Sequence, residues 1–224
     1  MATAPLYSII TPSAGKRPAA LGHAIDSVHE AMIRAGLDQD SVEMLVGYDG
    51  IQGPAVREYP FVQFLNLPQQ GNFGNGIRQM LLRVSKGNRI IFLDDDNALT
   101  PDALAVYSRY PDTELVIARI DVSRAFANPY LPEQVEGRDL FRPTNVDPLC
   151  MCLSRDLVQD RCGGWEIYEG YESDYRNLVR YYRRAHSVTI TNDIVGIYDA
   201  GRGMDQGGMN RRQQQTESPQ EITE

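Results

Sequence analysis

Two spacings of apolar residues alternate along the chain. Apolar residues recur every three or four positions from Leu21 to Met32 and from Ile77 to Val84, which predicts two helices. Short runs rich in apolar and β-branched residues predict strands between them, at 7–11, 42–48, 61–65, 89–93 and 114–120. Strands that alternate with helices predict an α/β fold with a mostly parallel central sheet flanked by helices.

The second half of the chain is less regular. Thr100-Pro101-Asp102 combines a capping residue, a proline and an early acid, so we expect Thr100 to cap a helix whose first position is Pro101. A stretch at 127–148 contains Pro and Asn, and it precedes further predicted elements. These are a strand at 149–154, a helix at 173–184 and a strand at 188–198.

From Gly201 the composition turns to Gly, Met, Gln, Asn and Arg. This predicts a mobile Gly-rich loop at 201–212 and a disordered tail at 213–224. We therefore expect one domain over 1–212.

Composition and charge narrow the class of protein. The 224 residues suffice for one substantial core, and the net charge of −8 argues against a protein that wraps nucleic acid. Cys150, Cys152 and Cys162 form no C-x-x-C pair, which predicts reduced thiols. The sequence shows neither a leader pattern nor an apolar run long enough for a transmembrane segment, so we expect a cytoplasmic protein.

The clearest candidate site is a group of three aspartates, Asp94-Asp95-Asp96, directly after the apolar strand at 89–93. Ligands of parallel α/β sheets bind at the carboxyl ends of strands, where Asp49 also lies. Adjacent carboxylates repel each other unless a cation or hydrogen-bond donors compensate them, and their oxygens suit Mg²⁺ or Mn²⁺. The alternative is a solvated acidic turn that caps the next helix.

Six short motifs occur in order along the chain: Ile9-Ile10-Thr11-Pro12, Val46-Gly47-Tyr48-Asp49-Gly50, Asn72-Phe73-Gly74, Ile91-Phe92-Leu93-Asp94-Asp95-Asp96, Gly163-Gly164-Trp165-Glu166 and Glu172-Ser173-Asp174. Each is weak alone, but their order and spacing resemble glycosyltransferase family 2, inverting enzymes with a GT-A fold. The resemblance implies a metal-dependent hexosyltransferase. Such an enzyme moves a sugar from a nucleotide-diphospho-sugar to an acceptor hydroxyl. A UDP-sugar is the first expectation, ahead of a GDP- or dTDP-sugar, and the sequence does not identify the acceptor.

The resemblance also implies roles for individual residues. The expected donor-binding residues are Thr11, Pro12, Arg17, Asp49, Asn72, Gly74, Arg78, Asp94, Asp95 and Trp165. Mn²⁺ or Mg²⁺ would be held by Asp94 and Asp96, with Asp199 in the region where many family members have a histidine. The general base would be Asp174, with Glu172 as the alternative, because Ser173 stands where the family usually has a glutamate. Residues 1–100 would form the nucleotide-binding half and 101–212 the acceptor-binding half.

Simpler interpretations stay open for several of these residues. Asp49 fits a turn, Arg78 a helix surface, Trp165 a core aromatic and Asp174 a helix cap. Two other functions also stay open. One is a nucleotide-sugar-binding protein without catalysis, and the other is a metal-dependent nucleotidyltransferase. The latter class needs a basic Gly-rich loop after the first strand, and only Gly15-Lys16-Arg17 corresponds to it.

Overall fold

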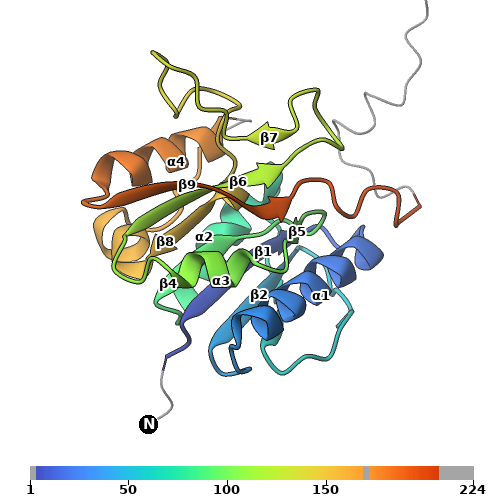
Figure 1. Ribbon diagram of the computed structural model, residues 1–224. Coiled ribbons are helices and arrows are strands. Elements are labelled where there is room, and N and C mark those ends of the chain that lie inside the picture. The colour runs from blue at the N-terminus through green and yellow to red at the C-terminus, as the bar shows by residue number, and fades with distance from the viewer. Residues whose placement is uncertain (1–3, 169–171, 207–224) are drawn as a thin grey trace, which may run out of the picture.

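The computed structural model describes residues 4–168 and 172–206, arranged around one mixed sheet (Figure 1). The strands are β1 (Tyr7–Ser13), β2 (Val42–Asp49), β3 (Val62–Leu67), β4 (Arg89–Phe92), β5 (Ala98–Leu99), β6 (Leu115–Asp121), β7 (Tyr130–Leu131), β8 (Met151–Ser154) and β9 (Val188–Ile197). The helices are α1 (Pro18–Ala35), α2 (Asn75–Val84), α3 (Ala103–Ser108) and α4 (Ser173–Arg184). Short helical turns are η1 (Asn72–Gly74), η2 (Pro148–Cys150) and η3 (Asp156–Arg161).

The first half of the chain forms a parallel sheet in the order β3-β2-β1-β4. The chain moves outward from β1 to β3 and then crosses back to β4, so α1 and α2 cover opposite faces (Figure 1). This explains why β1 and β4 are buried on both faces and lack a polar side. The carboxyl ends of all four strands meet at one edge of the sheet.

The second half adds strands of mixed direction. β8 is antiparallel to both β4 and β6, whereas β6 and β9 are parallel. The predicted α/β fold class is confirmed, and the sheet is mixed beyond β4. β5 and β7, each two residues long, were not predicted because such short pairings leave no periodic signal.

The predicted helix cap at Thr100 is wrong. Helix α3 begins at Ala103, and Thr100 instead continues the pairing of β5 with β9. Its backbone N–H donates to the carbonyl of Val195 at 2.9 Å, and its hydroxyl donates to the carbonyl of Ile194 at 2.7 Å. Pairing with β9 therefore determines the structure at Thr100, although the local sequence resembles a helix cap.

Helix α2 packs closely on the sheet because β2 has a glycine beneath it. A Cβ atom added to Gly47 would lie 2.6 Å from a methyl carbon of Ile77. Gly47 thus lets α2 approach the backbone of β2. This contact fixes the position of the loop that precedes α2, which forms part of the site described below.

The chain after β9 is fastened to the rest of the domain as far as residue 206. The N–H of Gly201 donates to the carbonyl of Asp96 at 2.9 Å, and Asp205 accepts from the N–H groups of Ala19 and Ala20, each at 2.9 Å. Residues 201–206 therefore close over the start of α1. The rest of the expected loop and the tail at 213–224 lie outside the described residues.

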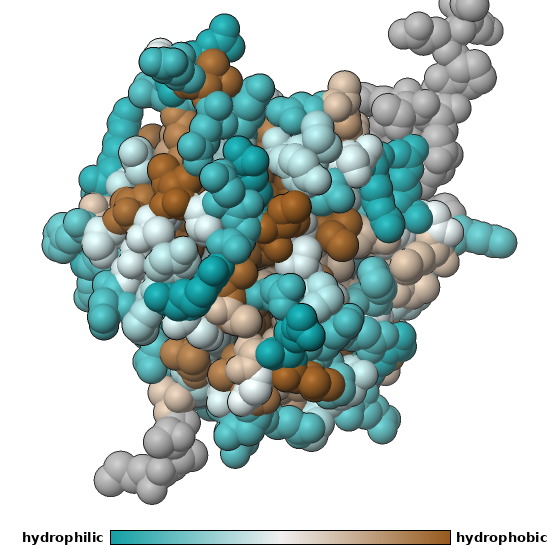
Figure 2. Space-filling view, viewed as in Figure 1, coloured by the Kyte–Doolittle hydropathy of each residue, from teal (hydrophilic) through white to brown (hydrophobic). Residues whose placement is uncertain are grey.

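None of the described helices is long and apolar enough to cross a lipid bilayer. The face that β9 crosses is mainly hydrophilic, with small separate hydrophobic patches (Figure 2). Val188, Ile190 and Ile194 are exposed on β9.

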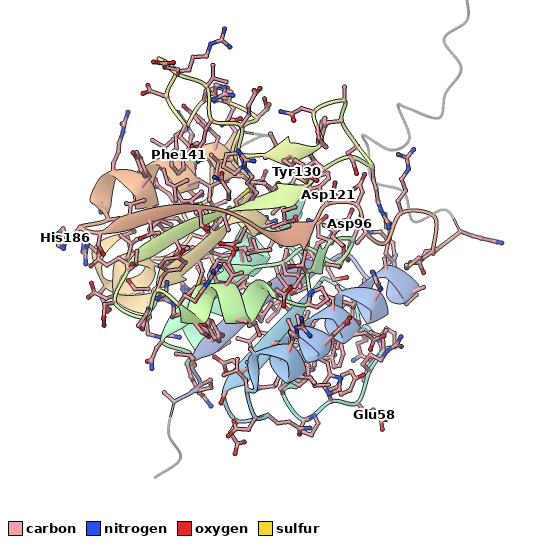
Figure 3. All side chains as sticks on the ribbon, viewed as in Figure 1. Glu58, Asp96, Asp121, Tyr130, Phe141 and His186 are labelled. Atoms are coloured by element: carbon pink, nitrogen blue, oxygen red, sulfur yellow. The ribbon has the colours of Figure 1, made fainter. Side chains whose placement is uncertain are left out.

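Glu114 joins three elements at the far end of the sheet. Both of its carboxylate oxygens accept from Arg161, at 2.5 and 2.9 Å, and one also accepts from the N–H of His186 at 2.6 Å. These contacts connect the start of β6 to η3 and to the end of α4. His186 lies at the opposite end of β9 from Asp96 (Figure 3). The hydrogen bonds from Arg161 lower the pKa of Glu114 to about 2.

Replacing Glu114 with Gln should lower the free energy of unfolding at pH 7 by about 1 to 3 kcal/mol. A carboxylate with a lowered pKa stabilises the fold above its ordinary pKa of 4.5 and loses this effect as pH falls toward 2. The difference between the proteins should therefore shrink with falling pH in urea titrations. Glu136→Gln, at an exposed loop position, is the control. A difference independent of pH would contradict this account of the ion pair.

Candidate active site

A cleft of about 430 Å³ opens at the carboxyl ends of the parallel strands, at the point between β1 and β4 where the strand order reverses. Ligands of α/β sheets bind at such points. The cleft is lined by Pro12, Ser13, Ala14, Arg17, Asp49, Gly71, Asn72, Phe73, Gly74, Asn75, Arg78, Asp94, Asp95, Asp96, Asn97, Ser173, Asp174 and Tyr198. Most of the predicted donor-binding residues therefore meet in one place.

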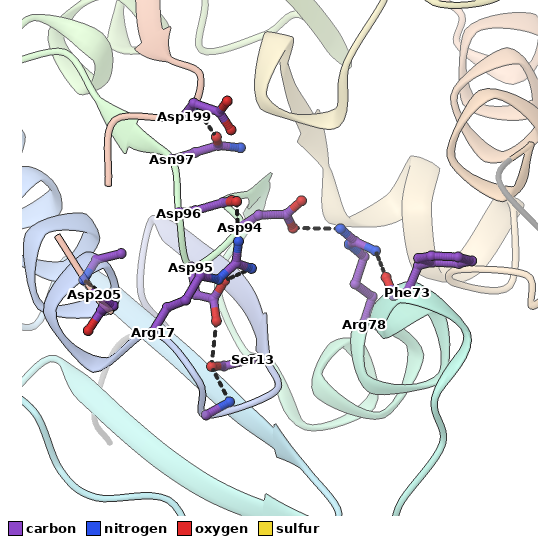
Figure 4. A network of polar contacts seen from close by, with 12 residues as sticks. Ser13, Arg17, Phe73, Arg78, Asp94, Asp95, Asp96, Asn97, Asp199 and Asp205 are labelled. Carbon is purple, nitrogen blue, oxygen red and sulfur yellow. Dashed lines mark hydrogen bonds and ion pairs between the residues drawn. The ribbon is translucent and has the colours of Figure 1, made fainter. Parts of the chain in front are cut away.

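Arg17 binds two of the three adjacent aspartates (Figure 4). Its Nη2 pairs with Asp95 and its Nη1 with Asp96, while the hydroxyl of Ser13 donates to the second oxygen of Asp95 at 2.6 Å. β1 supplies Ser13 at its last position, and Arg17 precedes α1. The turn after the first strand thus carries the positive charge that holds the end of the fourth strand.

Arg78 binds the third aspartate from the opposite wall (Figure 4). Its Nη2 donates to Asp94 at 2.5 Å, and its Nη1 donates to the carbonyl of Phe73 at 3.0 Å and lies 3.8 Å from a carboxylate oxygen of Asp174. The side chain is buried, and its guanidinium carbon lies 5.1 Å from the ring centre of Trp165. Arg78 therefore joins the aspartate cluster to the start of α4.

The cleft holds more negative than positive charge. Five of the residues that line it are aspartates, at 49, 94–96 and 174, and two are arginines, Arg17 and Arg78. Burial raises the pKa of Asp95 to about 6, Arg17 opposes the rise, and Asp96 adds to it. Burial also raises the pKa of Asp174, with Arg78 opposing and Asp94 adding. This excess of carboxylates favours a bound cation.

The turn before α2 has an unusual backbone. Asn72, Phe73 and Gly74 have φ values of 50°, 56° and 78°, so two residues with side chains adopt the left-handed conformation. Gly74 lies against β1, where a Cβ atom would meet Pro12 at 2.8 Å. The turn presents Phe73, 56% exposed, to the cleft. An exposed aromatic ring on strained backbone is a candidate contact for a ligand ring.

Asp49 and Asn72 hold neighbouring loops in place. Asp49 accepts from the N–H groups of Gln70 and Gly71, at 2.5 and 2.8 Å, and Asn72 donates to the carbonyl of Tyr168 at 2.8 Å. Asp49 therefore closes a turn and also lines the cleft. Its position is compatible with a turn residue and with a ligand contact.

Four predicted site residues do not line the cleft. Thr11 is fully buried in β1, and Asp199 is fully buried beside Asn97. Trp165 is 1% exposed, packs against Phe92 and donates its indole N–H to Asn75 at 2.8 Å. It supports Arg78 and offers no open face to a sugar. Glu172, two residues before Asp174, is exposed, whereas Asp174 lines the cleft.

The cleft also contains residues that the sequence did not single out as ligands, namely Ser13, Phe73, Asn97 and Tyr198. Ser13 and Phe73 adjoin recognised motifs, so their place in those motifs was an available signal. Asn97 and Tyr198 come together from distant segments: Asn97 accepts from the N–H of Asp199 at 2.9 Å.

A divalent cation fits this donor set in part. Carboxylate oxygens of Asp94 and Asp96 line the cleft, and such oxygens are the donors that Mg²⁺ and Mn²⁺ prefer. Among residues 4–168 and 172–206, no three His, Cys, Asp or Glu side chains lie close enough together to enclose a metal. A cation held by Asp94 and Asp96 would need the phosphate oxygens of a ligand, and Arg17 would have to turn away from Asp96.

Comparison with known proteins identifies the fold through solved structures. Neither known protein-family models nor curated proteins match the sequence. Solved structures do match. S. aureus TarS, residues 1–349, superposes with a TM-score of 0.69 over 85% of this chain at 14% identity. The chain has a GT-A fold. The mannosyltransferase PcManGT from Pyrobaculum calidifontis, in complex with GDP-Man and Mn²⁺, gives a TM-score of 0.63 over 88% of this chain at 16% identity.

TarS is also known in complex with UDP, and that structure superposes with a TM-score of 0.70 over 86% of this chain at 12% identity. This chain covers 59% of TarS 1–349, 60% of it in the UDP complex, and 57% of the mannosyltransferase. It therefore spans less than two-thirds of these relatives. The identities are low, so the similarity establishes the fold alone.

Asp147 is a further carboxylate whose charge acts on the cleft. It caps η2 by accepting from the N–H of Leu149 at 2.9 Å. Burial raises its pKa to about 7; Asp94 and Asp174 add to the rise, and Arg78 opposes it. No sequence motif marks Asp147, because only the fold brings the end of the 127–148 stretch near these groups.

Replacing Asp147 with Asn should raise the melting temperature by a few degrees at pH 8. An acid whose pKa is raised on folding destabilises the folded state once pH passes its unfolded value, and the effect is complete above the folded value of about 7. The gain should disappear as pH falls to about 4. Asp139→Asn, in the exposed part of the same stretch, is the control for calorimetry. A gain of equal size at both pH values would contradict the burial of a charged Asp147.

Proposed function

We propose that this protein is a glycosyltransferase that transfers a sugar from a nucleotide-diphospho-sugar to an acceptor hydroxyl. The observation that carries the proposal is the joint position of the strand-end aspartates and Asp174 in one cleft of a GT-A fold, with Arg78 between them. The TarS structures with UDP and UDP-GlcNAc and the mannosyltransferase with GDP-Man support this class of donor.

The donor diphosphate would lie beside Arg17 and Arg78, whose guanidinium groups match phosphate oxygens in geometry and charge. Both arginines are paired with aspartates. A phosphate that replaced a carboxylate partner would therefore leave each guanidinium group with an anionic partner. Asp49, at the end of β2, would contact the ribose or the base. The exposed ring of Phe73 offers a face against which the base or the sugar can pack.

The acceptor hydroxyl needs a base that removes its proton as the new glycosidic bond forms. Asp174 lines the cleft, lies 3.8 Å from Arg78 and has a raised pKa, which improves a carboxylate as a proton acceptor. A single displacement by that hydroxyl would invert the configuration of the sugar. Glu172 is the weaker candidate, because its side chain is exposed outside the cleft.

Mn²⁺ or Mg²⁺ is proposed as the cofactor, held by Asp94 and Asp96 together with the donor phosphates. When bound, the cation would stabilise the negative charge that develops on the leaving diphosphate. The excess of carboxylates over guanidinium groups among the residues that line the cleft supports this assignment. Asp199 is fully buried beside the site, where its backbone N–H donates to the side-chain oxygen of Asn97 at 2.9 Å.

Two alternatives have specific features against them. A nucleotidyltransferase would use a Gly-rich basic loop after the first strand to cradle phosphates, whereas the turn after β1 has a single glycine, Gly15, followed by Lys16 and Arg17. A binding protein without catalysis would not need a carboxylate at position 174 in the cleft. The expected cytoplasmic location stays a prediction, as does the division of the domain at residue 100.

Calorimetric titration of UDP, GDP and dTDP, with and without Mn²⁺, tests the proposed donor site. One nucleotide should bind the native chain in a Mn²⁺-dependent manner, with affinity reduced at least about tenfold in Asp96→Ala because one metal ligand is lost. Asp102→Ala removes an exposed carboxylate outside the cleft and should bind like the native chain. Failure of all three nucleotides to bind would overturn the proposed function.

The proposed base is tested by Asp174→Asn, with Glu172→Gln as the matched control. The first change should lower the rate of sugar transfer by about a hundredfold or more while nucleotide affinity stays nearly constant, because only proton removal is lost. Glu172→Gln should retain most of the activity. Transfer to water, detected as donor hydrolysis, can serve as the readout until the acceptor is known. The opposite ranking of the two variants would assign the base to Glu172.

A further inference from the structure

A second groove, of about 470 Å³, runs along the outward face of α4. It is lined by Tyr168, Tyr175, Arg176, Val179, Arg180, Arg183 and Arg184. None of these described lining residues carries a carboxylate. The proposed reaction at the strand ends uses none of them.

The groove is positive although the protein is acidic. α4 contains four arginines and one aspartate, whereas the whole chain has a net charge of −8. Arg180 pairs with Glu166 at 2.6 Å, and Arg184 donates to the carbonyl of Arg161 at 2.6 Å. Within the described part of the chain, Arg176 and Arg183 have no carboxylate at ion-pair distance. Both are exposed, so their charges are available to a ligand.

The aromatic residues make this groove more than a charged helix face. The guanidinium group of Arg176 lies over the ring of Tyr168, with 4.7 Å from its carbon to the ring centre. The hydroxyl of Tyr175 donates to the carbonyl of Phe141 at 3.3 Å, and the ring of Phe141 stacks on that of Tyr182 of α4, with 4.3 Å between the ring centres. These contacts hold the walls of the groove. Tyrosine faces accept sugar rings, and guanidinium groups bind phosphate or carboxylate with two parallel hydrogen bonds.

The groove adjoins the cleft through two connections. The carbonyl of Tyr168 accepts from Asn72, which lines the cleft, at 2.8 Å. Asp174 lies in the first turn of the same helix that carries the arginines. The rise of an α-helix places Arg183 about 14 Å along the axis from Asp174. A chain molecule whose end reaches Asp174 could therefore extend along α4.

We propose that this groove binds the acidic part of the acceptor, which is a saccharide chain bearing phosphate or carboxylate groups. This inference rests on the proposed glycosyltransferase function. A recessed groove with polar walls fits a hydrated chain better than a flat lipid surface. The net charge of −8 opposes docking to an anionic bilayer or to nucleic acid, which both need a broad positive surface.

The test measures binding of two anionic probes to the full chain in metal-free buffer: a short oligogalacturonate, with one carboxylate per sugar, and a short linear polyphosphate. A neutral dextran oligomer is the uncharged control. Arg176→Ala/Arg183→Ala removes the two groove arginines that have no carboxylate partner among the described residues. Arg34→Ala/Arg83→Ala is the matched control, because it removes two exposed arginines from other helices. Nucleotide binding is measured on every variant.

At least one anionic probe should bind the native chain, and the groove variant should weaken it by about tenfold or more, since two charge-assisted contacts are lost. The probe that binds identifies carboxylate or phosphate as the acidic group. The control variant should bind both the probe and the nucleotide like the native chain.

If the native chain binds a nucleotide but neither anionic probe, the groove assignment is overturned and the proposed function stays intact. The same holds if both double variants bind the anionic probe equally well. Vesicles of phosphatidylglycerol and phosphatidylcholine are tested in the same way. If the groove variant lost binding to these vesicles and neither anionic probe bound the native chain, the groove would be assigned to a membrane surface in place of an acceptor. No nucleotide binding to the native chain would overturn the proposed function and, with it, the acceptor assignment.

Discussion

The pairing of strand-end aspartates with two arginines is the interaction on which this site depends. Parallel strands bring three carboxylates to the topological switch point, where burial makes their mutual repulsion costly. Arg17 compensates two of them from the turn after β1, and Arg78 compensates the third from α2. The carboxylates could not be held at this edge without these partners. The same pairs fix the distance between the two walls of the cleft.

Arg78 transmits this constraint to the second half of the protein. Its guanidinium group contacts Asp94, the carbonyl of Phe73 and the region of Asp174, and Trp165 supports it from below. The donor side and the proposed base are therefore positioned by one buried side chain. A ligand that displaced Asp94 from Arg78 would change the electrostatic environment of the donor site and of Asp174 together. This coupling suits a reaction in which leaving group and base must be ready at the same time.

The unequal distribution of charge suggests how the two substrates are kept apart. The cleft has an excess of carboxylates and suits a donor that arrives with a divalent cation, whereas the groove on α4 has an excess of guanidinium groups. The two regions meet near Asn72 and the start of α4. A donor and an acidic acceptor would then approach Asp174 from opposite sides, each in the field that favours it.

Much of the fold could be predicted because it follows from local patterns. The apolar runs that became β1, β2 and β4 and the spacing that became α2 and α4 are properties of neighbouring residues. Strands that are buried on both faces of a parallel sheet consist of nearly continuous apolar runs, so such runs indicate strands. The pairs β5 and β7 were missed, and Thr100 was predicted as a helix cap, because a strand partner distant in sequence decides such short segments.

The sequence by itself determined that acidic residues gather at the end of a buried strand and that Asp174 begins a helix, since both follow from local order along the chain. Only the tertiary structure decided which charges meet. It paired Arg17 with Asp95 and Asp96, buried Trp165 beneath Arg78, and left Glu172 outside the cleft. Contacts of this kind depend on how separate elements pack, and packing is set by the whole core rather than by any one segment.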